Sequence, residues 1–148
     1  MKKYDKAIID TTYLLLLFGI KVHGIEYDTV INASRELNVK LLYPQLAIPE
    51  LIAKIGKEMY RKNMKEIPEE VKEAITALLL GVDIELVPPK PNYLETAIKL
   101  RALGHRDIFD NILYATSLHE KTYFITRDRE FIKFLKENKL PVNHIVEY

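Results

Sequence analysis

The sequence predicts an α/β fold in which a central, mostly parallel, twisted sheet carries helices on both faces. Short runs rich in β-branched and aromatic residues alternate along the chain with longer segments of helical periodicity. Parallel strands need crossover connections, and helices usually supply them, so this alternation indicates three layers. The chain has 148 residues, 48% of them hydrophobic, which suits one domain with a substantial core. We therefore expect a single domain over residues 1–148.

Five short segments are expected as strands. Each combines apolar residues with flanking polar, Gly or Pro residues that end regular structure. The expected strands cover residues 7–10, 39–43, 82–87, 122–126 and 143–148.

Seven segments between these strands have helical periodicity. Thr11 or Thr12 is expected to cap the first helix, with Gly19 near its end. Pro49 either kinks the third helix or marks its start, and Gly81 is expected to end the fourth. The expected helices cover residues 11–19, 27–38, 46–61, 67–81, 91–104, 107–120 and 128–138.

Composition excludes several classes of protein. The formal net charge is +1, so overall charge favours neither nucleic acid nor membranes as a partner. The absence of cysteine excludes disulfides, thiolate metal sites and cysteine nucleophiles. The start imitates a signal peptide through Lys2 and Lys3, but Asp5 and Asp10 interrupt it, and "YLLLLFGI" is far shorter than the roughly 20 residues of a membrane span. We expect a cytoplasmic protein.

Acidic residues recur where an α/β fold gathers its strand ends. In open parallel sheets, sites form outside the carboxyl ends of the strands. Asp10 ends the first expected strand, and Asp128 follows the strand 122–126. Asp110 lies in the first turn of the helix before that strand, among apolar neighbours, and Glu50 lies in the first turn of another helix. These carboxylates are therefore expected in one crevice.

Each acid also has an ordinary structural interpretation. Asp10, Asp107 and Asp128 stand where helix N-caps are expected, and Glu50 suits the positive end of a helix dipole. Asp107 is the natural cap of its helix, and Asp110 stands three residues later, as in a capping box. Together, however, clustered carboxylates repel one another, and a hard divalent cation such as Mg²⁺ would remove that cost.

Four motifs containing these acids resemble those of PIN-domain nucleases, in order and spacing. They are "IIDTTYLL", "PELIAKI", "DIFDNILYATSL" and "TYFITRDREF", and the resemblance spans residues 6–148. It implies a PIN-like three-layer α/β/α fold. Four residues match the family's catalytic, metal-binding acids: Asp10, Glu50, Asp110 and Asp128.

Further positions follow from the same resemblance. Thr126 matches a hydroxyl beside the site, Thr11 is expected to support it, and Asp107 is an extra acid that could join the metal ligands. Asn111 departs from the pattern, because a small apolar residue is common there. Coordination of a metal and positioning of a water are both open for its side chain.

The resemblance implies a function as well as a fold. It implies cleavage of single-stranded RNA, or single-stranded regions of structured RNA, by a water that Mg²⁺ or Mn²⁺ activates. Many small members resemble VapC-type toxins, which have an antitoxin protein as partner, and a homodimer is expected. The alternative is a catalytically silent PIN-like module that binds RNA or protein. The absence of Asp-x-Asp after the first strand and of G-x-G-x-x-G disfavours a haloacid-dehalogenase-like phosphotransferase and a dinucleotide-binding module.

Basic residues give weaker indications. Lys54, Lys57, Arg61 and Lys65 follow Glu50 at helical spacing, and they and Arg127 could hold RNA phosphates, although a solvated helix face is the favoured interpretation.

Two further groups of residues are expected to be structural. His105 and His119 are expected at the surface. Tyr13, Leu14, Leu17 and Phe18 are expected in the core, with a groove for an antitoxin or a second copy near residues 13–19 as the less favoured interpretation.

Overall fold

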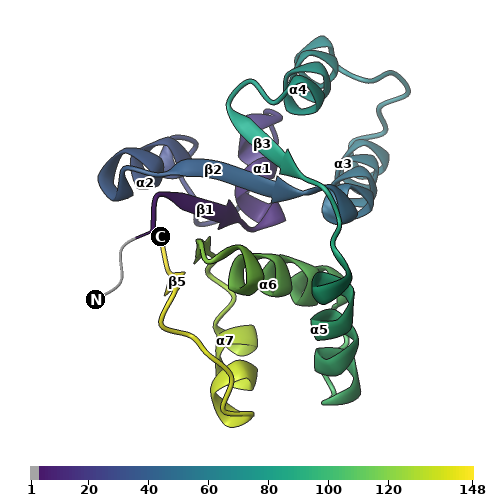
Figure 1. The fold of residues 1–148 in the computed structure, drawn as a ribbon. Coiled ribbons are helices and arrows are strands. Elements are labelled where there is room, and N and C mark those ends of the chain that lie inside the picture. The colour runs from purple at the N-terminus through teal and green to yellow at the C-terminus, as the bar shows by residue number, and fades with distance from the viewer. Residues whose placement is uncertain (1–3) are drawn as a thin grey trace.

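The sheet of this computed structural model, which describes residues 4–148, is five-stranded and entirely parallel. Its strand order is β3-β2-β1-β4-β5 (Figure 1). The expected fold class and all five expected strands are therefore confirmed. The strands are β1 (Lys6–Ile9), β2 (Lys40–Pro44), β3 (Ile84–Val87), β4 (Tyr123–Ile125) and β5 (Ile145–Val146). Lys2 and Lys3, which give the start of the chain its signal-like charge, lie outside the described residues.

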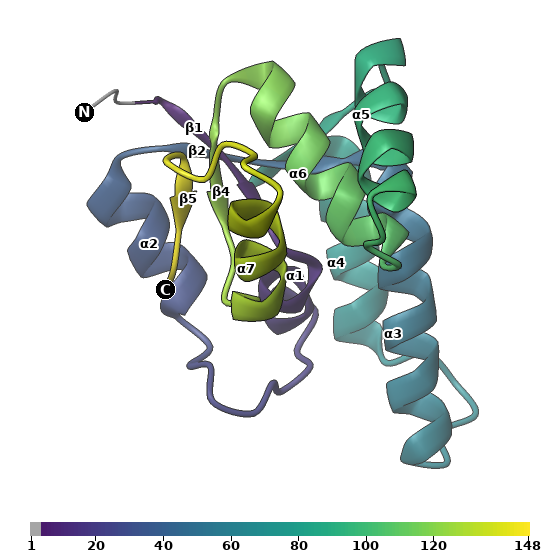
Figure 2. The ribbon, with the colours of Figure 1, turned by 90° about the horizontal axis from the view of Figure 1, so that it is seen from below.

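Helices cover both faces of the sheet. In Figure 1, α5, α6 and α7 lie below β1, β2 and β3, α1 and α4 lie towards the top, and α2 lies beside the left end of β2; Figure 2 shows the lower layer from underneath. The helices are α1 (Thr11–Leu17), α2 (Thr29–Leu37), α3 (Ile48–Arg61), α4 (Glu69–Leu80), α5 (Pro91–Ala102), α6 (Ile108–Glu120) and α7 (Arg129–Glu137), with a short 3-10 turn η1 (Gln45–Ala47) before α3. No described helix is both long enough and apolar enough to cross a membrane.

Strand β1 is the centre of the core. Ala7, Ile8 and Ile9 are fully buried, as expected for a strand with a helical layer on each face. Its register aligns Ala7 with Leu41 of β2 and with Tyr123 of β4. The strands before Asp10, before η1 and before Thr126 consequently end at the same edge of the sheet.

At the start of α1, the capping interpretation of Asp10 is confirmed. Asp10 is the N-cap, and its Oδ1 accepts a bond from the Thr12 amide at 3.4 Å. The expectation that Thr11 or Thr12 caps this helix is wrong, because Thr11 is already helical and its hydroxyl bonds the Tyr43 hydroxyl at 2.6 Å. Thr11 thus joins α1 to the end of β2.

Proline and glycine set other helix boundaries. Pro49 stands in the first turn of α3, where a missing amide hydrogen costs nothing, so it marks the start of the helix and does not kink it. Gly81 ends α4 with a φ of 67°, a left-handed conformation that glycine adopts without strain. Helix α6 packs against β1, β2 and β4 and so brings its first turn to the carboxyl edge of the sheet.

Candidate active site

A cavity of about 280 Å³ lies at the carboxyl edge of the sheet, where β1 and β4 end and α6 begins. It contains four of the five acids singled out in the sequence. The remaining lining residues include two cations, a tyrosine and an apolar side chain. The full lining is Asp10, Thr12, Tyr13, Ile25, Lys54, Asp107, Asp110, Arg127 and Asp128. The carboxylates expected in one crevice are therefore brought together, except that Glu50 stands behind this lining.

Asp10 is fixed from two sides at the end of the central strand. Its Oδ2 accepts a bond from the Thr126 hydroxyl at 2.7 Å, and its Oδ1 accepts the capping bond from Thr12. Burial raises the pKa of Asp10, Thr126 and Thr12 lower it, and the Asp128 charge raises it further. Asp10 is thus an oriented carboxylate whose negative charge is poorly compensated.

Asp110 lies in the first turn of α6 and is 8% exposed. Burial raises the pKa of Asp110 to about 9, and the charges of Asp107, Asp10 and Asp128 contribute. A carboxyl group with this pKa carries its proton at neutral pH in the metal-free protein. Asp110 is therefore the clearest sign that negative charge is crowded in the cavity.

Glu50 is held in the first turn of α3 and is 7% exposed. Burial raises the pKa of Glu50, Thr11 and Lys54 lower it, and Asp107 and Asp10 raise it again. Among residues 4–148 its Oε1 is buried without a hydrogen-bond partner, and its Oε2 lies 4.0 Å from Lys54 Nζ. A buried carboxylate oxygen without a partner is costly, so this atom fits a cation ligand.

Asp107 and Asp128 combine capping with a place at the cavity. Asp107 Oδ1 accepts bonds from the amides of Phe109 at 3.0 Å and Asp110 at 3.2 Å. Asp128 Oδ1 accepts the Phe131 amide at 3.0 Å and caps α7. The capping interpretation of both residues is confirmed, and it coexists with their position on the cavity wall.

The donor set fits a hard divalent cation. Carboxylate oxygens are the ligands that Mg²⁺ and Mn²⁺ prefer, and the unpartnered Oε1 of Glu50 supplies one without breaking an existing bond. Within residues 4–148, no three acidic or histidine side chains already stand at mutual ligand spacing. The residues that would hold the ion are Asp10, Glu50, Asp110 and Asp128.

The basic residues divide into two groups. Lys54 and Arg127 line the cavity. Lys57 is exposed away from the lining, and the Arg61 guanidinium bonds Glu58 at 2.6 Å. On α3, Lys54 alone reaches the cavity, and the favoured interpretation of a solvated helix face describes Lys57 and Arg61.

His105 and Asn111 form a unit that the sequence did not reveal. Asn111 is fully buried, its Oδ1 lies 2.8 Å from His105 Nδ1, and its Nδ2 donates to the His105 carbonyl at 3.2 Å. Because both polar ends of Asn111 bond His105, neither metal coordination nor water positioning describes Asn111 in this structure. The expected surface position of His105 is also wrong, because its ring packs on Phe131 and Phe134.

Three other cavity residues are not among the site residues expected from the sequence: Thr12, Tyr13 and Ile25. Tyr13 was placed in the core, yet it lines the cavity while its hydroxyl donates to the Tyr148 carbonyl at 2.6 Å. Ile25 belongs to the loop between α1 and α2, and no pattern in the sequence marks it.

His119 is half-buried and pairs with Thr96 at 2.6 Å, so its expected surface position is wrong as well.

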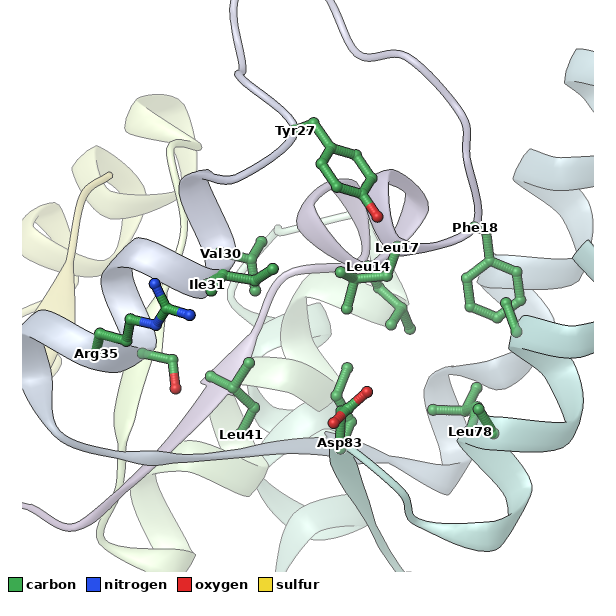
Figure 3. A pocket seen from close by; sticks show the side chains of 14 residues that line it. Leu14, Leu17, Phe18, Tyr27, Val30, Ile31, Arg35, Leu41, Leu78 and Asp83 are labelled. Carbon is green, nitrogen blue, oxygen red and sulfur yellow. The ribbon is translucent and has the colours of Figure 1, made fainter. Parts of the chain in front are cut away.

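A second, apolar hollow of about 460 Å³, here called the apolar groove, lies among α1, α2 and α4 (Figure 3). Leu14 and Phe18 are buried, as expected for core residues, and they still line the groove together with half-buried Leu17. Figure 3 shows the Tyr27 ring at one side and the Asp83 carboxylate at another. Leu14, Leu17 and Phe18 thus line the apolar groove, and its occupation by a partner stays a prediction.

Comparison with known proteins identifies the family. Residues 7–136 match the family model described as PIN domain, so the chain belongs to the PIN-domain family. The resemblance noted in the four motifs is thereby confirmed. A comparison with curated protein sequences finds no match.

Two solved structures share the fold. A toxin-antitoxin complex from Klebsiella pneumoniae contains a chain with a TM-score of 0.62 and 17% identity, covering 95% of this chain and 96% of that one. VapBC2 from Rickettsia felis, bound to a DNA fragment from its promoter, contains a chain with a TM-score of 0.57 and 11% identity, covering 96% of each. These similarities support the PIN-like three-layer α/β/α architecture.

Proposed function

We propose that this chain is a divalent-metal-dependent endoribonuclease that cleaves single-stranded RNA. One observation carries the proposal: buried acids from separate elements gather at one edge of the sheet. The pKa values of Asp10, Glu50 and Asp110 are all raised by burial, and neighbouring carboxylates raise each further. Such crowding costs stability without a cation, so the arrangement favours metal binding over a purely structural role.

The ion is Mg²⁺ or Mn²⁺ in this proposal, and when bound it would activate the attacking water and neutralise charge on the phosphate. The protein orients the ligands: Thr126 holds Asp10, and the first turns of α3 and α6 fix Glu50 and Asp110. Lys54 is directed at the same cavity. Its ammonium group is suited to a phosphate oxygen once Glu50 engages the cation.

The test is cleavage of a labelled single-stranded RNA in Mg²⁺, in Mn²⁺ and in chelator. We expect cleavage by the wild type with either ion, none in chelator, and none by Asp10→Asn or Asp128→Asn. Asp128→Asn keeps an oxygen that can cap α7, so its fold should survive. Equal cleavage by wild type and Asp10→Asn would indicate a contaminating nuclease. Metal-independent RNA binding without cleavage would favour the silent binding module.

We further propose that the chain is a VapC-type toxin and that an antitoxin protein occupies the apolar groove. The two similar solved structures are toxin–antitoxin assemblies, and the groove is lined mostly by apolar side chains that a partner segment could contact. Its rim carries Arg35 and Asp83, charges of opposite sign that could fix the direction of that segment.

The partner proposal is tested with the small protein encoded immediately upstream of this chain's gene. Co-expression should yield a complex, and the partner should inhibit cleavage. Leu17→Glu, at a half-buried position of the groove, should lose the complex while it keeps nuclease activity. Leu80→Glu is the matched control, because Leu80 is 75% exposed and outside the groove lining. Absence of any such upstream gene would contradict the toxin assignment and leave the nuclease untouched.

A further inference from the structure

The loop of residues 19–28, which joins α1 to α2, borders both hollows of the molecule. Ile25 lines the acidic cavity, and Tyr27, two residues later, lines the apolar groove. Figure 3 shows the Tyr27 ring reaching over the groove from this loop. The conformation of the loop therefore shapes the wall of the candidate active site.

Arg127 ties this loop to the strand edge. Its Nη1 donates to the Gly24 carbonyl at 2.6 Å, which joins residues 103 positions apart in the sequence. Bonds within the loop run between near neighbours, for example from the Ile25 amide to the Val22 carbonyl at 3.3 Å. Gly24 has a φ of 79°, a left-handed value that a side chain would disfavour. The backbone of Gly24 is thus free to take the conformation in which Arg127 bonds its carbonyl.

The position of Arg127 in the sequence explains why it can hold the Gly24 carbonyl. It follows Thr126, whose hydroxyl bonds Asp10, and precedes Asp128, whose carboxylate caps α7. Its backbone is therefore held by ordered neighbours on both sides. A charged guanidinium that donates to a carbonyl makes a stronger bond than a neutral donor does. A backbone that is held on both sides and a charged donor together allow Arg127 to restrain the 19–28 loop.

We propose that Arg127 is a positioning residue: it holds the 19–28 loop in place so that Ile25 forms a fixed wall of the acidic cavity. This inference rests on the proposed nuclease function, because the wall matters through the substrate that the cavity receives. It differs from a direct phosphate contact, because the role rests on the bond that Nη1 donates to the Gly24 carbonyl. Lys54 has no such bond to a loop and remains the cation that faces substrate.

The first measurement needs no activity. Hydrogen–deuterium exchange of the amides of residues 20–27 is compared for wild type, Arg127→Gln and Arg129→Gln. Arg129→Gln is a matched control, because Arg129 is a neighbouring exposed arginine that bonds Glu147 and not the loop. We expect exchange in this loop to be about tenfold faster in Arg127→Gln and unchanged in the control. Unchanged exchange in Arg127→Gln would overturn the proposal, whatever the protein cleaves.

The second measurement separates positioning from phosphate binding. Steady-state cleavage of single-stranded RNA is measured for Arg127→Gln, Ile25→Ala and the double variant. If Arg127 acts through the Ile25 wall, each single variant should raise KM by about tenfold with little change in kcat, and the double variant should be no worse than the worse single one. Arg127→Lys should recover part of the loss.

Additive effects of the two substitutions would overturn the positioning role in favour of an independent phosphate contact. Faster loop exchange with an unchanged KM would show that the wall does not serve the substrate, which also overturns the proposal. Failure of the wild type to cleave any RNA would refute the proposed function, and the exchange measurement would still decide whether Arg127 holds the loop.

Discussion

The Thr126 hydroxyl donates to Asp10 Oδ2 at 2.7 Å and accepts the Asp128 amide at 3.1 Å. One buried hydroxyl, 116 residues from Asp10 in the sequence, therefore links the first and the last of the four acids. Neighbouring parallel strands make this possible, because Asp10 follows β1, Thr126 follows β4, and the Asp10 amide bonds the Ile125 carbonyl at 3.0 Å. The orientation of Asp10 is thus set by sheet register.

Replacing this hydroxyl should impair the site. Thr126→Val keeps the shape but leaves a buried oxygen of Asp10 and the Asp128 amide without a partner. We expect a cost of about 1–3 kcal/mol in free energy of unfolding. The pKa of Asp10 should rise further, because Thr126 lowers it. Urea unfolding checks the change in free energy of unfolding, and metal titration checks the change at Asp10. Thr126→Ser should behave like wild type, and a Val variant equal to Ser would show that the bond is unimportant.

The metal-free protein should lose stability as the pH rises, partly through Asp110. Its pKa moves from an ordinary value of 3.8 in the unfolded chain to about 9 in the folded protein. Between these values the folded state binds the extra proton, so this contribution to stability is complete below about pH 4 and is lost by about pH 9. Asp110→Asn should flatten the dependence and be the more stable protein at alkaline pH.

The check is urea unfolding in chelator at about pH 5 and pH 8 for both proteins. Saturating Mg²⁺ should reduce the difference between them, because a bound cation favours the ionised carboxylate. Burial also raises the pKa values of Asp10 and Glu50, so some slope should remain in the variant. An Asp110→Asn protein with the full wild-type slope would refute the assignment of the proton to Asp110.

Asp107 and Asp110 lie three residues apart on the same turn but should differ in function. Asp107 Oδ1 is occupied by two backbone amides, and Asp110 is buried against the other acids. We expect Asp110→Asn to abolish cleavage and Asp107→Asn to retain measurable activity. Asp107→Ala should cost about 1 kcal/mol of stability, as a lost cap does. An inactive, folded Asp107→Asn would make Asp107 a site residue.

The extent of prediction from sequence can be judged from these same residues. Asp10 and Asp128 were predictable as neighbours, because each follows an apolar strand and parallel strands end at one edge. The roles of Asn111 and Ile25 were not, since both depend on contacts between segments whose distance the sequence does not encode. His105 is expected at the surface from the sequence, and only the contact of the α5–α6 turn with α7 places its ring on Phe131. Periodicity in the sequence thus predicted the helices and strands. The loop conformations and the side-chain contacts could be found only from the three-dimensional structure.

A homodimer is expected from an exposed apolar surface on α5 and α6. Leu94, Ile98 and Ile108 are 45%, 69% and 55% exposed, and they border a hollow of about 620 Å³. Light scattering at micromolar concentration should give twice the monomer mass of 17.3 kDa, and Ile98→Asp should reduce it to the monomer value. Leu80→Asp, on α4, should remain dimeric. A monomeric wild type would contradict the expected homodimer and would leave the proposed nuclease activity unaffected.

The central claim, that the clustered acids bind a divalent cation, is tested most directly by calorimetric titration of Mn²⁺ into the metal-free protein. Asp110 carries a proton at neutral pH, because burial raises its pKa to about 9, so binding should release that proton. The heat should therefore depend on the ionisation enthalpy of the buffer. We expect saturable binding by wild type with proton release, and strongly weakened binding without that release in Asp110→Asn. Equal affinity and equal proton release in both proteins would contradict the account.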